Sequence, residues 1–245
     1  MITETYCKKH GVEKTRHEFA GIGKIIYSCS VCGKEAEEKE AEAKKTEDQK
    51  KTQAIINKRL ENAMIAPRFQ GKTLEGYQTP TEGQKKALEV AKAFIENFKT
   101  TPGLILVGGP GTGKNHLAAG ISFEVIHKGY TVLFIELSKA IRTVKESWRK
   151  DGEAESVILK SFLLPDLLVI DEVGVQFQSD TERLYLTEII NDRYNYLKPT
   201  ILIGNLSAGE LKALVGDRIL DRFRDGGRMI VCDWKSYRGI VKSDC

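Results

Sequence analysis

Short apolar runs alternate with helical patterns from about Phe69 to Cys245. This alternation predicts a parallel β-sheet whose strands are joined by helices that cover it. The pattern therefore predicts an α/β fold, with a five-stranded parallel sheet flanked by helices. The expected strands are Leu104–Val107, Thr131–Glu136, Leu167–Ile170, Thr200–Gly204 and Met229–Cys232.

A charged helix is expected before this domain. From Lys34 to about Ala66 the chain is dense in Lys, Glu, Ala and Gln and has no Gly or Pro. Residue propensity and charge pairs four positions apart both favour a helix there, and Pro67 ends it. Its first half has almost no apolar face, so we expect the helix to begin exposed and to dock at its end. The apolar face returns at Ala54, Ile55, Ile56, Leu60, Ala63 and Met64.

Two pairs of candidate metal ligands lie near the start of the chain. Each pair has two residues between its members, and the short, Gly-containing stretch Gly11–Ser28 separates the pairs. Three thiolates and one imidazole fit a closed tetrahedral zinc site, which leaves no open position for catalysis and is therefore structural. Residues 1–33 are too few for a core of their own, so the metal would supply their fold. Reduced cysteines without a metal are the alternative. The four candidate ligands are Cys7, His10, Cys29 and Cys32.

These patterns predict a zinc-binding module at residues 1–33, a charged helical linker or docking arm at 34–68, and the α/β domain at 69–245. The net charge of +4 is compatible with a nucleic-acid partner without requiring one. No apolar run approaches a membrane span, and Met1–Lys9 is polar. The five cysteines are odd in number and unevenly placed, which argues against a secreted disulfide framework. We therefore expect a cytoplasmic protein with no membrane partner.

The strongest chemical signal is a glycine-rich loop between the strand Leu104–Val107 and the helical run His116–His127. Glycines let successive backbone N–H groups turn inward around a phosphate, and the following helix presents its positive N-terminal end. Lys114 can reach the β and γ oxygens of ATP. Asn115 stands where Ser or Thr normally supplies a hydroxyl to Mg²⁺, and its amide can bind the metal directly, bind through water, or weaken binding. The predicted P-loop consists of Gly108, Gly109, Pro110, Gly111, Thr112, Gly113 and Lys114.

Polar residues also follow two other expected strands, at the edge where such sheets bind ligands. After Leu167–Ile170, Asp171 is expected to hold Mg²⁺ and Glu172 to polarise an attacking water. After Thr200–Gly204, Asn205 is expected to orient water against the γ-phosphate, with a turn-forming role as the alternative.

A helical stretch near the end of the domain carries three arginines, of which Arg218 and Arg222 share a face. An arginine supplied across a subunit boundary can neutralise charge on a transferred phosphate, which would make activity depend on assembly. Ion pairing within the stretch is the alternative. The arginines are Arg218, Arg222 and Arg224, and the candidate partners are Asp217, Asp221 and Asp225.

In this order, GGPGTGKNH, LLVIDEVG, GNL, GDRILDRFR and DWKSYR resemble the DnaC/IstB group of AAA+ ATPases, particularly DnaC-type replicative helicase loaders. The resemblance covers about Phe69 to the C-terminus, and the pair Asn115 and His116 is typical of the DnaC-type P-loop. It implies an AAA+ fold that hydrolyses ATP with Mg²⁺. It assigns the Walker A lysine to Lys114, the Walker B acids to Asp171 and Glu172, sensor 1 to Asn205, the trans-acting arginine finger to Arg222 and sensor 2 to Arg238.

The resemblance also implies partners. Such loaders assemble as ATP-bound spirals, engage a hexameric DnaB-type helicase through their N-terminal regions, and hold single-stranded DNA with their ATPase domains. In the family, the segment matching residues 145–150 and the place of Ser179 contact DNA. An exposed aromatic ring beside cations suits base stacking and phosphate contact, whereas a tryptophan packed in the core is the alternative. The candidate DNA-binding residues are Lys145, Trp148 and Arg149.

The N-terminal region departs from many DnaC-type loaders, which begin with a helical helicase-binding region. DnaI-type loaders and phage-encoded relatives carry zinc there, so we expect this module and the charged helix to dock a helicase in a bacterial cytoplasm, for the host or a phage. Nucleic-acid binding by the zinc module is an open alternative. Two other function classes are an IstB-like ATPase that assists a transposase on duplex DNA and a non-catalytic adaptor.

Overall fold

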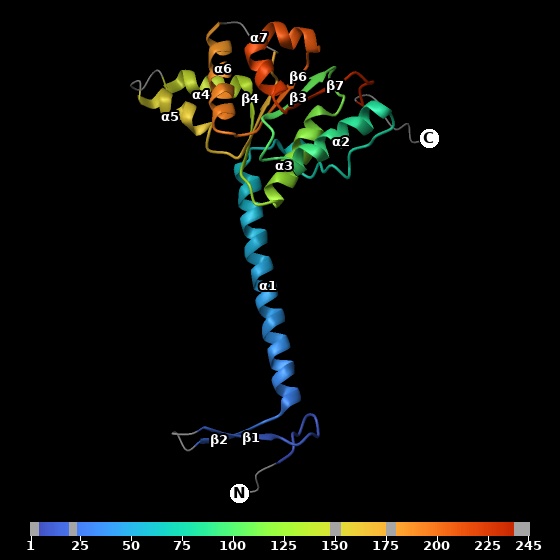
Figure 1. The fold of residues 1–245 in the computed structure, drawn as a ribbon, viewed down its shortest axis with the longest axis vertical. Helices are drawn as coiled ribbons and strands as arrows, with labels where there is room; N and C mark the ends of the chain where they lie inside the picture. Colours follow the sequence, from blue (N-terminus) through green and yellow to red (C-terminus); the bar gives the residue numbers. More distant parts are fainter. Residues whose placement is uncertain (1–4, 20–23, 148–152, 175–179, 238–245) are drawn as a thin grey trace. The chain divides into compact units, whose positions relative to one another are not determined.

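The computed structural model describes residues 5–19, 24–147, 153–174 and 180–237. By its contacts the chain separates into two units, Met1–Ile55 and Ile56–Cys245 (Figure 1). In the first unit, the strands β1 (Thr15–Phe19) and β2 (Lys24–Ser28) form an antiparallel hairpin. The helix α1 (Ser30–Asn62) follows the hairpin.

The helix α1 confirms the expected charged helix, although both of its ends lie four residues earlier than predicted. It begins within the second candidate ligand pair, and Met64, which has a positive φ of 56°, lies in the turn that follows its end. None of its own residues is buried. Ile56 and Leu60 nevertheless pack against the core of the second unit, and Ala63 is fully buried. The expected docking at the end of the helix is therefore confirmed at Ile56, Leu60 and Ala63. The other residues of the expected apolar face are exposed: Ala54, Ile55 and Met64.

The second unit is built on a five-stranded sheet in the order β4-β5-β6-β3-β7, with every neighbouring pair parallel. All five predicted strands are confirmed to within one residue. Parallel sheets are buried on both faces, which explains the unbroken apolar runs that mark β3, β5 and β6 in the sequence. The strands are β3 (Gly103–Gly108), β4 (Val132–Glu136), β5 (Leu167–Asp171), β6 (Thr200–Gly204) and β7 (Arg228–Cys232).

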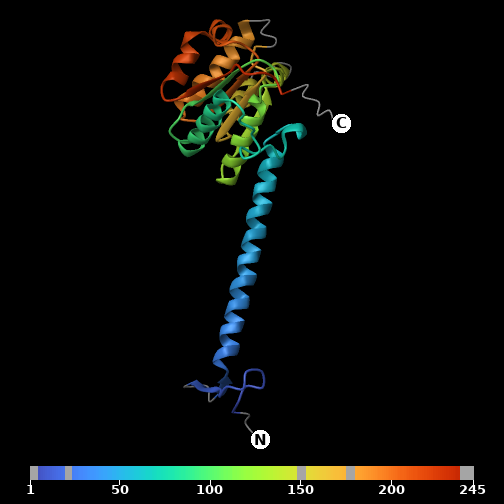
Figure 2. The same cartoon turned by 90° about the vertical axis from the view of Figure 1, so that its right-hand side faces the viewer.

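Helices cover both faces of this sheet (Figures 1 and 2). Leu104 and Leu106 of β3 face one hydrophobic cluster, whereas Ile105 and Val107 face the other, as the two-residue period of a strand requires. The short 3₁₀ helix η1 (Pro67–Phe69), α2 (Glu82–Glu96) and α3 (Lys114–His127) contribute to the first cluster. The second cluster is covered by α4 (Leu137–Ser147), α5 (Glu153–Ser161), α6 (Asp180–Asn195) and α7 (Ala208–Arg224). No helix in the described ranges is long and apolar enough to span a membrane.

A buried arginine holds the amino-terminal ends of two central strands. Arg193 of α6 is fully buried, and burial lowers its pKa to about 9, which leaves it charged at neutral pH. Its guanidinium donates to the Thr200 hydroxyl at 3.0 Å and to four backbone carbonyls in the loops that precede β5 and β6. The carbonyl oxygens belong to Phe162, Pro165, Asp166 and Pro199, at 2.6, 3.0, 3.2 and 2.7 Å.

Candidate nucleotide site and metal centre

The predicted P-loop connects β3 to α3, and two of its glycines are fixed by their surroundings. Gly108 has a φ of 129°, and a Cβ there would lie 2.2 Å from the backbone oxygen of Cys232. Gly113 has a φ of 92°, and a Cβ there would lie 3.0 Å from the ring of Tyr77. A side chain at either position would meet both an unfavourable φ and a close neighbour.

Lys114 is buried, and its ammonium lies within the loop. It donates to the carbonyl oxygens of Gly108 and Gly109 at 2.8 and 2.7 Å, and it lies 3.4 Å from the hydroxyl of Thr112. Because these acceptors are neutral, the positive charge of the ammonium is not cancelled by them. The arrangement can therefore attract the oxygens of a phosphate group.

The Walker B candidate Asp171 contacts Asn115, the residue that follows the P-loop directly. The side-chain amide of Asn115 donates a short hydrogen bond to Asp171 Oδ2, and the Glu172 backbone N–H donates to Asp171 Oδ1 at 2.7 Å. Burial raises the pKa of Asp171, while these hydrogen bonds act in the opposite direction. Glu172 is exposed and has a φ of 58°, a conformation that is uncommon for residues other than glycine and that recurs at functional sites.

Strand order brings Asn205 to the same edge of the sheet. The strand β6 lies between β5 and β3, so the residues after all three strands are neighbours at their carboxyl ends. Asn205 is exposed there, and the next residue, Leu206, accepts a hydrogen bond from the Gly108 backbone N–H at 2.9 Å. The structure thus brings the P-loop, Asp171, Glu172 and Asn205 to one edge.

His116 contacts the segment that precedes α2. Its Nε2 lies 2.8 Å from the backbone oxygen of Thr73, and its ring meets Tyr77 edge-on at 5.3 Å between centroids. Burial lowers the pKa of His116, which favours the neutral ring. Because Thr73 occupies Nε2, we interpret this histidine as a tether between α3 and that segment.

The three arginines of α7 differ in their contacts. Arg222 donates from Nε to Asn191 Oδ1 at 2.5 Å, and its guanidinium lies 4.6 Å from the ring centre of Tyr194. Arg224 pairs with Asp221 at 2.9 Å, so the ion-pair alternative holds for this residue.

Arg218 is exposed and follows Gly216, whose φ of 79° interrupts the helix. Of the other two candidate partners, Asp217 pairs with Lys212, and Asp225 accepts a hydrogen bond from Tyr194.

Most of the candidate DNA contacts fall outside the described residues. Trp148, Arg149 and Ser179 lie there, as does the sensor 2 candidate Arg238. Lys145, at the end of α4, pairs with Glu182 of α6 at 3.1 Å.

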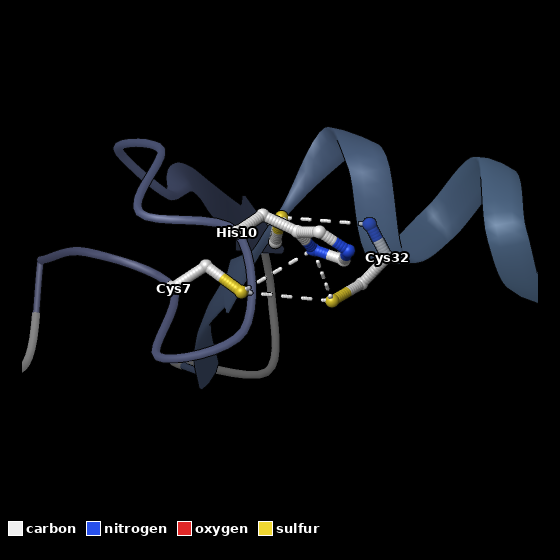
Figure 3. A group of neighbouring side chains, drawn as sticks. Cys7, His10 and Cys32 are labelled. Carbon is white, nitrogen blue, oxygen red and sulfur yellow. Dashed lines mark hydrogen bonds between the residues drawn. The ribbon is translucent and has the colours of Figure 1, made fainter.

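The four predicted zinc ligands come together in the first unit. Their ligand atoms all lie within 4.8 Å of one another, a grouping that could hold a metal ion. The Nδ1 atom of His10 lies 3.7, 3.6 and 3.3 Å from the sulfurs of Cys7, Cys29 and Cys32, and the sulfurs of Cys7 and Cys32 are 3.6 Å apart. Figure 3 shows the side chains of Cys7, His10 and Cys32 pointing toward one another. The pKa values of the cysteines move in different directions. A backbone hydrogen bond from His10 is the largest of the effects that lower the pKa of Cys7 to about 6, whereas a hydrogen bond with Cys7 and burial raise the pKa of Cys32 to about 11.

Glu35, which the sequence pattern does not mark, orients the histidine of this cluster. The other ring nitrogen of His10, Nε2, lies 2.9 Å from Glu35 Oε1, and Glu35 also pairs with Lys9. A carboxylate bonded to the distal nitrogen fixes the tautomer and the direction of a metal-binding imidazole. The only signal in the sequence is that Glu35 lies one helical turn after Cys32. Because acidic residues are frequent in this charged helix, that spacing does not mark Glu35.

The sequence profile described as "IstB-like ATP binding protein" matches residues 42–244. The chain belongs to this family. The chain is 37% identical over 179 residues to the replicative helicase loader DnaC of Escherichia coli strain K12, and these residues are 72% of this chain and 73% of that protein. It is 33% identical over 175 residues to DnaC of Buchnera aphidicola subsp. Schizaphis graminum, covering 70% of this chain and 71% of that one.

Solved structures agree with this membership. A crystal structure of the DnaC helicase loader matches with a TM-score of 0.60 at 26% identity, covering 68% of this chain and 99% of that one. The replication initiator DnaA, bound to AMPPCP and single-stranded DNA, matches with a TM-score of 0.60 at 26% identity, covering 70% of this chain and 52% of that one. The predicted AAA+ P-loop fold and the resemblance to DnaC-type proteins are confirmed.

Proposed function

We propose that this member of the IstB-like family is an ATPase that binds a hexameric DnaB-type helicase and delivers it onto single-stranded DNA during replication initiation. The observation that carries the proposal is the 37% identity to the helicase loader DnaC over 72% of the chain. The bond between Asn115 and Asp171 supports it, because a P-loop and a Walker B acid must meet around one nucleotide. The likeness to DnaA bound to AMPPCP and single-stranded DNA supports both proposed ligands.

In this proposal the residues at the carboxyl edge divide the work of ATP hydrolysis. Lys114 binds the β- and γ-phosphates, and Asp171 and Asn115 hold the Mg²⁺ that accompanies ATP. Oxygen ligands suit this hard cation, and since Asn115 donates through Nδ2, its Oδ1 is the atom offered to the metal. Glu172 polarises the attacking water and Asn205 orients it. The remaining P-loop residues and His116 shape the nucleotide site, with Arg238 as its sensor 2.

The ATPase assignment is tested by two variants with different expected losses. Lys114→Ala should abolish tight ATP binding, measured by calorimetry, because no other cation of the described loop replaces the ammonium. Glu172→Gln should retain ATP binding and lose hydrolysis, because an amide cannot take up the proton of water. ATP binding without DNA-stimulated hydrolysis, unaffected by Glu172→Gln, would instead favour a non-catalytic nucleotide-binding adaptor. Hydrolysis by Glu172→Gln at the wild-type rate would exclude Glu172 as the group that polarises water.

The trans role of Arg222 needs a matched control, because the residue also has neighbours within its own subunit. Arg222→Ala should leave ATP binding nearly intact and lower hydrolysis in the assembled spiral. Arg224→Ala, two residues away and paired with Asp221, should leave both properties intact. Thermal unfolding of Arg222→Ala controls for the loss of its contacts with Asn191 and Tyr194. Equal loss of ATP binding in the Lys114 and Arg222 variants would exclude the trans role.

Zinc is the metal that we propose for the cluster in the first unit. Tetrahedral Zn²⁺ with bonds of about 2.3 Å to sulfur and 2.0–2.1 Å to nitrogen places two sulfurs about 3.8 Å apart and sulfur and nitrogen about 3.6 Å apart. The corresponding separations in this chain are 3.6 Å and 3.3–3.7 Å. The ligands Cys7, His10, Cys29 and Cys32 therefore fit zinc, which would hold the small module together. Atomic absorption should give one zinc per chain, and Cys29→Ser should lower it.

The partners are tested with the intact chain. Mixed with a hexameric DnaB-type helicase and ATP, it should form a complex of defined stoichiometry, and the zinc-ligand variant should fail to form it if the first unit is the docking arm. Trp148→Ala should weaken single-strand binding by about 1–3 kcal/mol if the ring stacks on a base.

The IstB-like family profile favours one alternative, an ATPase that assists a transposase on duplex DNA. Retention of a transposase and not of the helicase would support that alternative.

A further inference from the structure

The segment Asp233–Tyr237, which follows β7, contacts backbone carbonyls of the P-loop; we call it the brace. The indole N–H of Trp234 donates to the carbonyl oxygen of Thr112 at 2.8 Å. The backbone N–H of Tyr237 donates to the carbonyl oxygen of Gly111 at 2.9 Å. The two acceptors are consecutive carbonyls of the loop, so the brace holds two adjacent peptide groups.

The brace is itself held by the first turn of α2. A Cβ at Gly83 would lie 3.2 Å from the ring of Trp234, so the indole packs against the backbone of that turn. Gln84 is buried, and its side-chain amide donates to the hydroxyl of Tyr237 at 2.9 Å. The same Gln84 forms a capping box with Thr81, which fixes its side chain at the helix start. The ring of Trp234 and the hydroxyl of Tyr237 thus have set positions.

The geometry of the peptide bond gives these two hydrogen bonds a consequence for the other side of the loop. In a trans peptide, the C=O of one residue and the N–H of the next belong to one plane and point in opposite directions. A donor that holds the Gly111 carbonyl outward therefore directs the Thr112 N–H inward, and a donor on the Thr112 carbonyl directs the Gly113 N–H inward. We infer that Trp234 and the Tyr237 backbone N–H pre-orient these two amides for the phosphates of the nucleotide.

Trp234 is thus a positioning residue that acts through the P-loop without touching the nucleotide. The inference rests on the proposed ATP site. Without its indole N–H, the Thr112–Gly113 peptide is held in its binding orientation for a smaller fraction of the time, and the apparent affinity falls by that fraction. ATP affinity should fall, whereas the rate at saturating ATP should change little, because the reacting groups Glu172 and Asn205 lie after other strands.

The first test is Trp234→Phe, which keeps an aromatic ring against Gly83 and removes the N–H. We expect the dissociation constant for ATP to rise about threefold to tenfold, the range of one neutral hydrogen bond. The KM for ATP should rise in parallel with kcat nearly unchanged. Lys235→Ala, an exposed position of the brace, is the matched control and should bind ATP like the wild type. Wild-type affinity in Trp234→Phe would overturn the inference.

A second measurement does not depend on how well that variant folds. The chain has two tryptophans, so Trp148→Phe leaves Trp234 as the single indole. ATP should change the emission of Trp234 with the same dissociation constant that calorimetry gives. Unchanged emission while calorimetry records binding would count against the brace. Absence of calorimetric binding in both the wild type and Trp148→Phe would instead contradict the proposed ATPase, so the two failures are distinguishable.

Discussion

Replacement of the buried Arg193 by methionine should strongly destabilise the second unit. The guanidinium donates to four backbone carbonyls and one hydroxyl, and the side chain is fully buried. Arg193→Met keeps an unbranched side chain in this space and removes all five hydrogen bonds. The hydroxyl of Thr200 loses a donor but keeps its own O–H, which can rotate, and the carbonyl of Pro199 also accepts from the Leu168 N–H at 3.3 Å. The other three carbonyls that lose the guanidinium belong to Phe162, Pro165 and Asp166.

The magnitude follows from these three acceptors. A buried acceptor left without a donor costs about 1–3 kcal/mol, and removing one partner of a buried charged network typically costs about 3–5 kcal/mol. Methionine also removes the cost of burying a charge, so we expect a loss of about 3–5 kcal/mol in the free energy of unfolding. That is a large part of the roughly 5–15 kcal/mol that stabilises an ordinary domain.

Urea unfolding at neutral pH, followed by circular dichroism, measures this loss as a lower midpoint. Arg183→Met, an exposed position on the same helix, is the matched control and should stay within about 0.5 kcal/mol of the wild type. Arg193→Lys should fall between the two, because an ammonium has three donors where the guanidinium has five. A loss below about 1 kcal/mol in Arg193→Met would refute the reasoning, since it would mean that the carbonyls find other donors.

Three further predictions concern other parts of the chain. Gly113→Ala should lose ATP binding in calorimetry, because its φ of 92° and the neighbouring ring exclude a side chain; unchanged affinity would contradict this. Glu35→Gln should weaken zinc binding about 10- to 100-fold in competition with a chelator, and equal affinity would show that orientation of the histidine does not matter. The pKa of Asp166 is lowered from 3.8 to about 2, because hydrogen bonds from Thr131 and Lys99 outweigh the opposite effect of burial. Its stabilisation is therefore present above about pH 3.8 and lost as the pH falls toward 2, so the difference in melting temperature between the wild type and Asp166→Asn should close over that range. A constant difference would exclude the carboxylate as its cause.

The sequence predicted those features that depend on local pattern. The strands β3, β5 and β6 are apolar runs because both faces of a parallel sheet are buried. The glycine-rich loop and the acidic pair each follow one of these runs in the sequence, so their place at a strand end could be predicted. The contact of Asn115 with Asp171 follows from that arrangement, since β6 alone separates β3 from β5. The roles of the individual site residues stay predictions.

The sequence could not reveal residues whose partners are distant backbone atoms. Arg193 bonds four carbonyls in two loops, and nothing in the polar pattern of α6 distinguishes it from an exposed arginine. Trp234 bonds the carbonyl of Thr112, which lies far from it along the chain. The early start of α1 at Ser30 was also missed, because propensity places a helix end only to within a few residues.

Arg193 and Trp234 therefore both support the nucleotide site, but their loss should change different quantities. Loss of Arg193 should lower the free energy of unfolding, and loss of Trp234 should lower the affinity for ATP. Arg193 lies at the amino-terminal ends of β5 and β6, so its loss lowers the fraction of folded chains and reaches the nucleotide site only through that fraction. Trp234 holds one peptide of the loop, so its loss changes ATP affinity while the sheet stays folded. ATP added in excess should then restore much of the stability of Arg193→Met, because binding to the native state alone shifts the unfolding equilibrium. The same addition should stabilise Trp234→Phe less than the wild type at equal ATP, since its affinity is lower. Opposite responses of the two variants would show that the brace belongs to the folding core of the sheet and not to the nucleotide site.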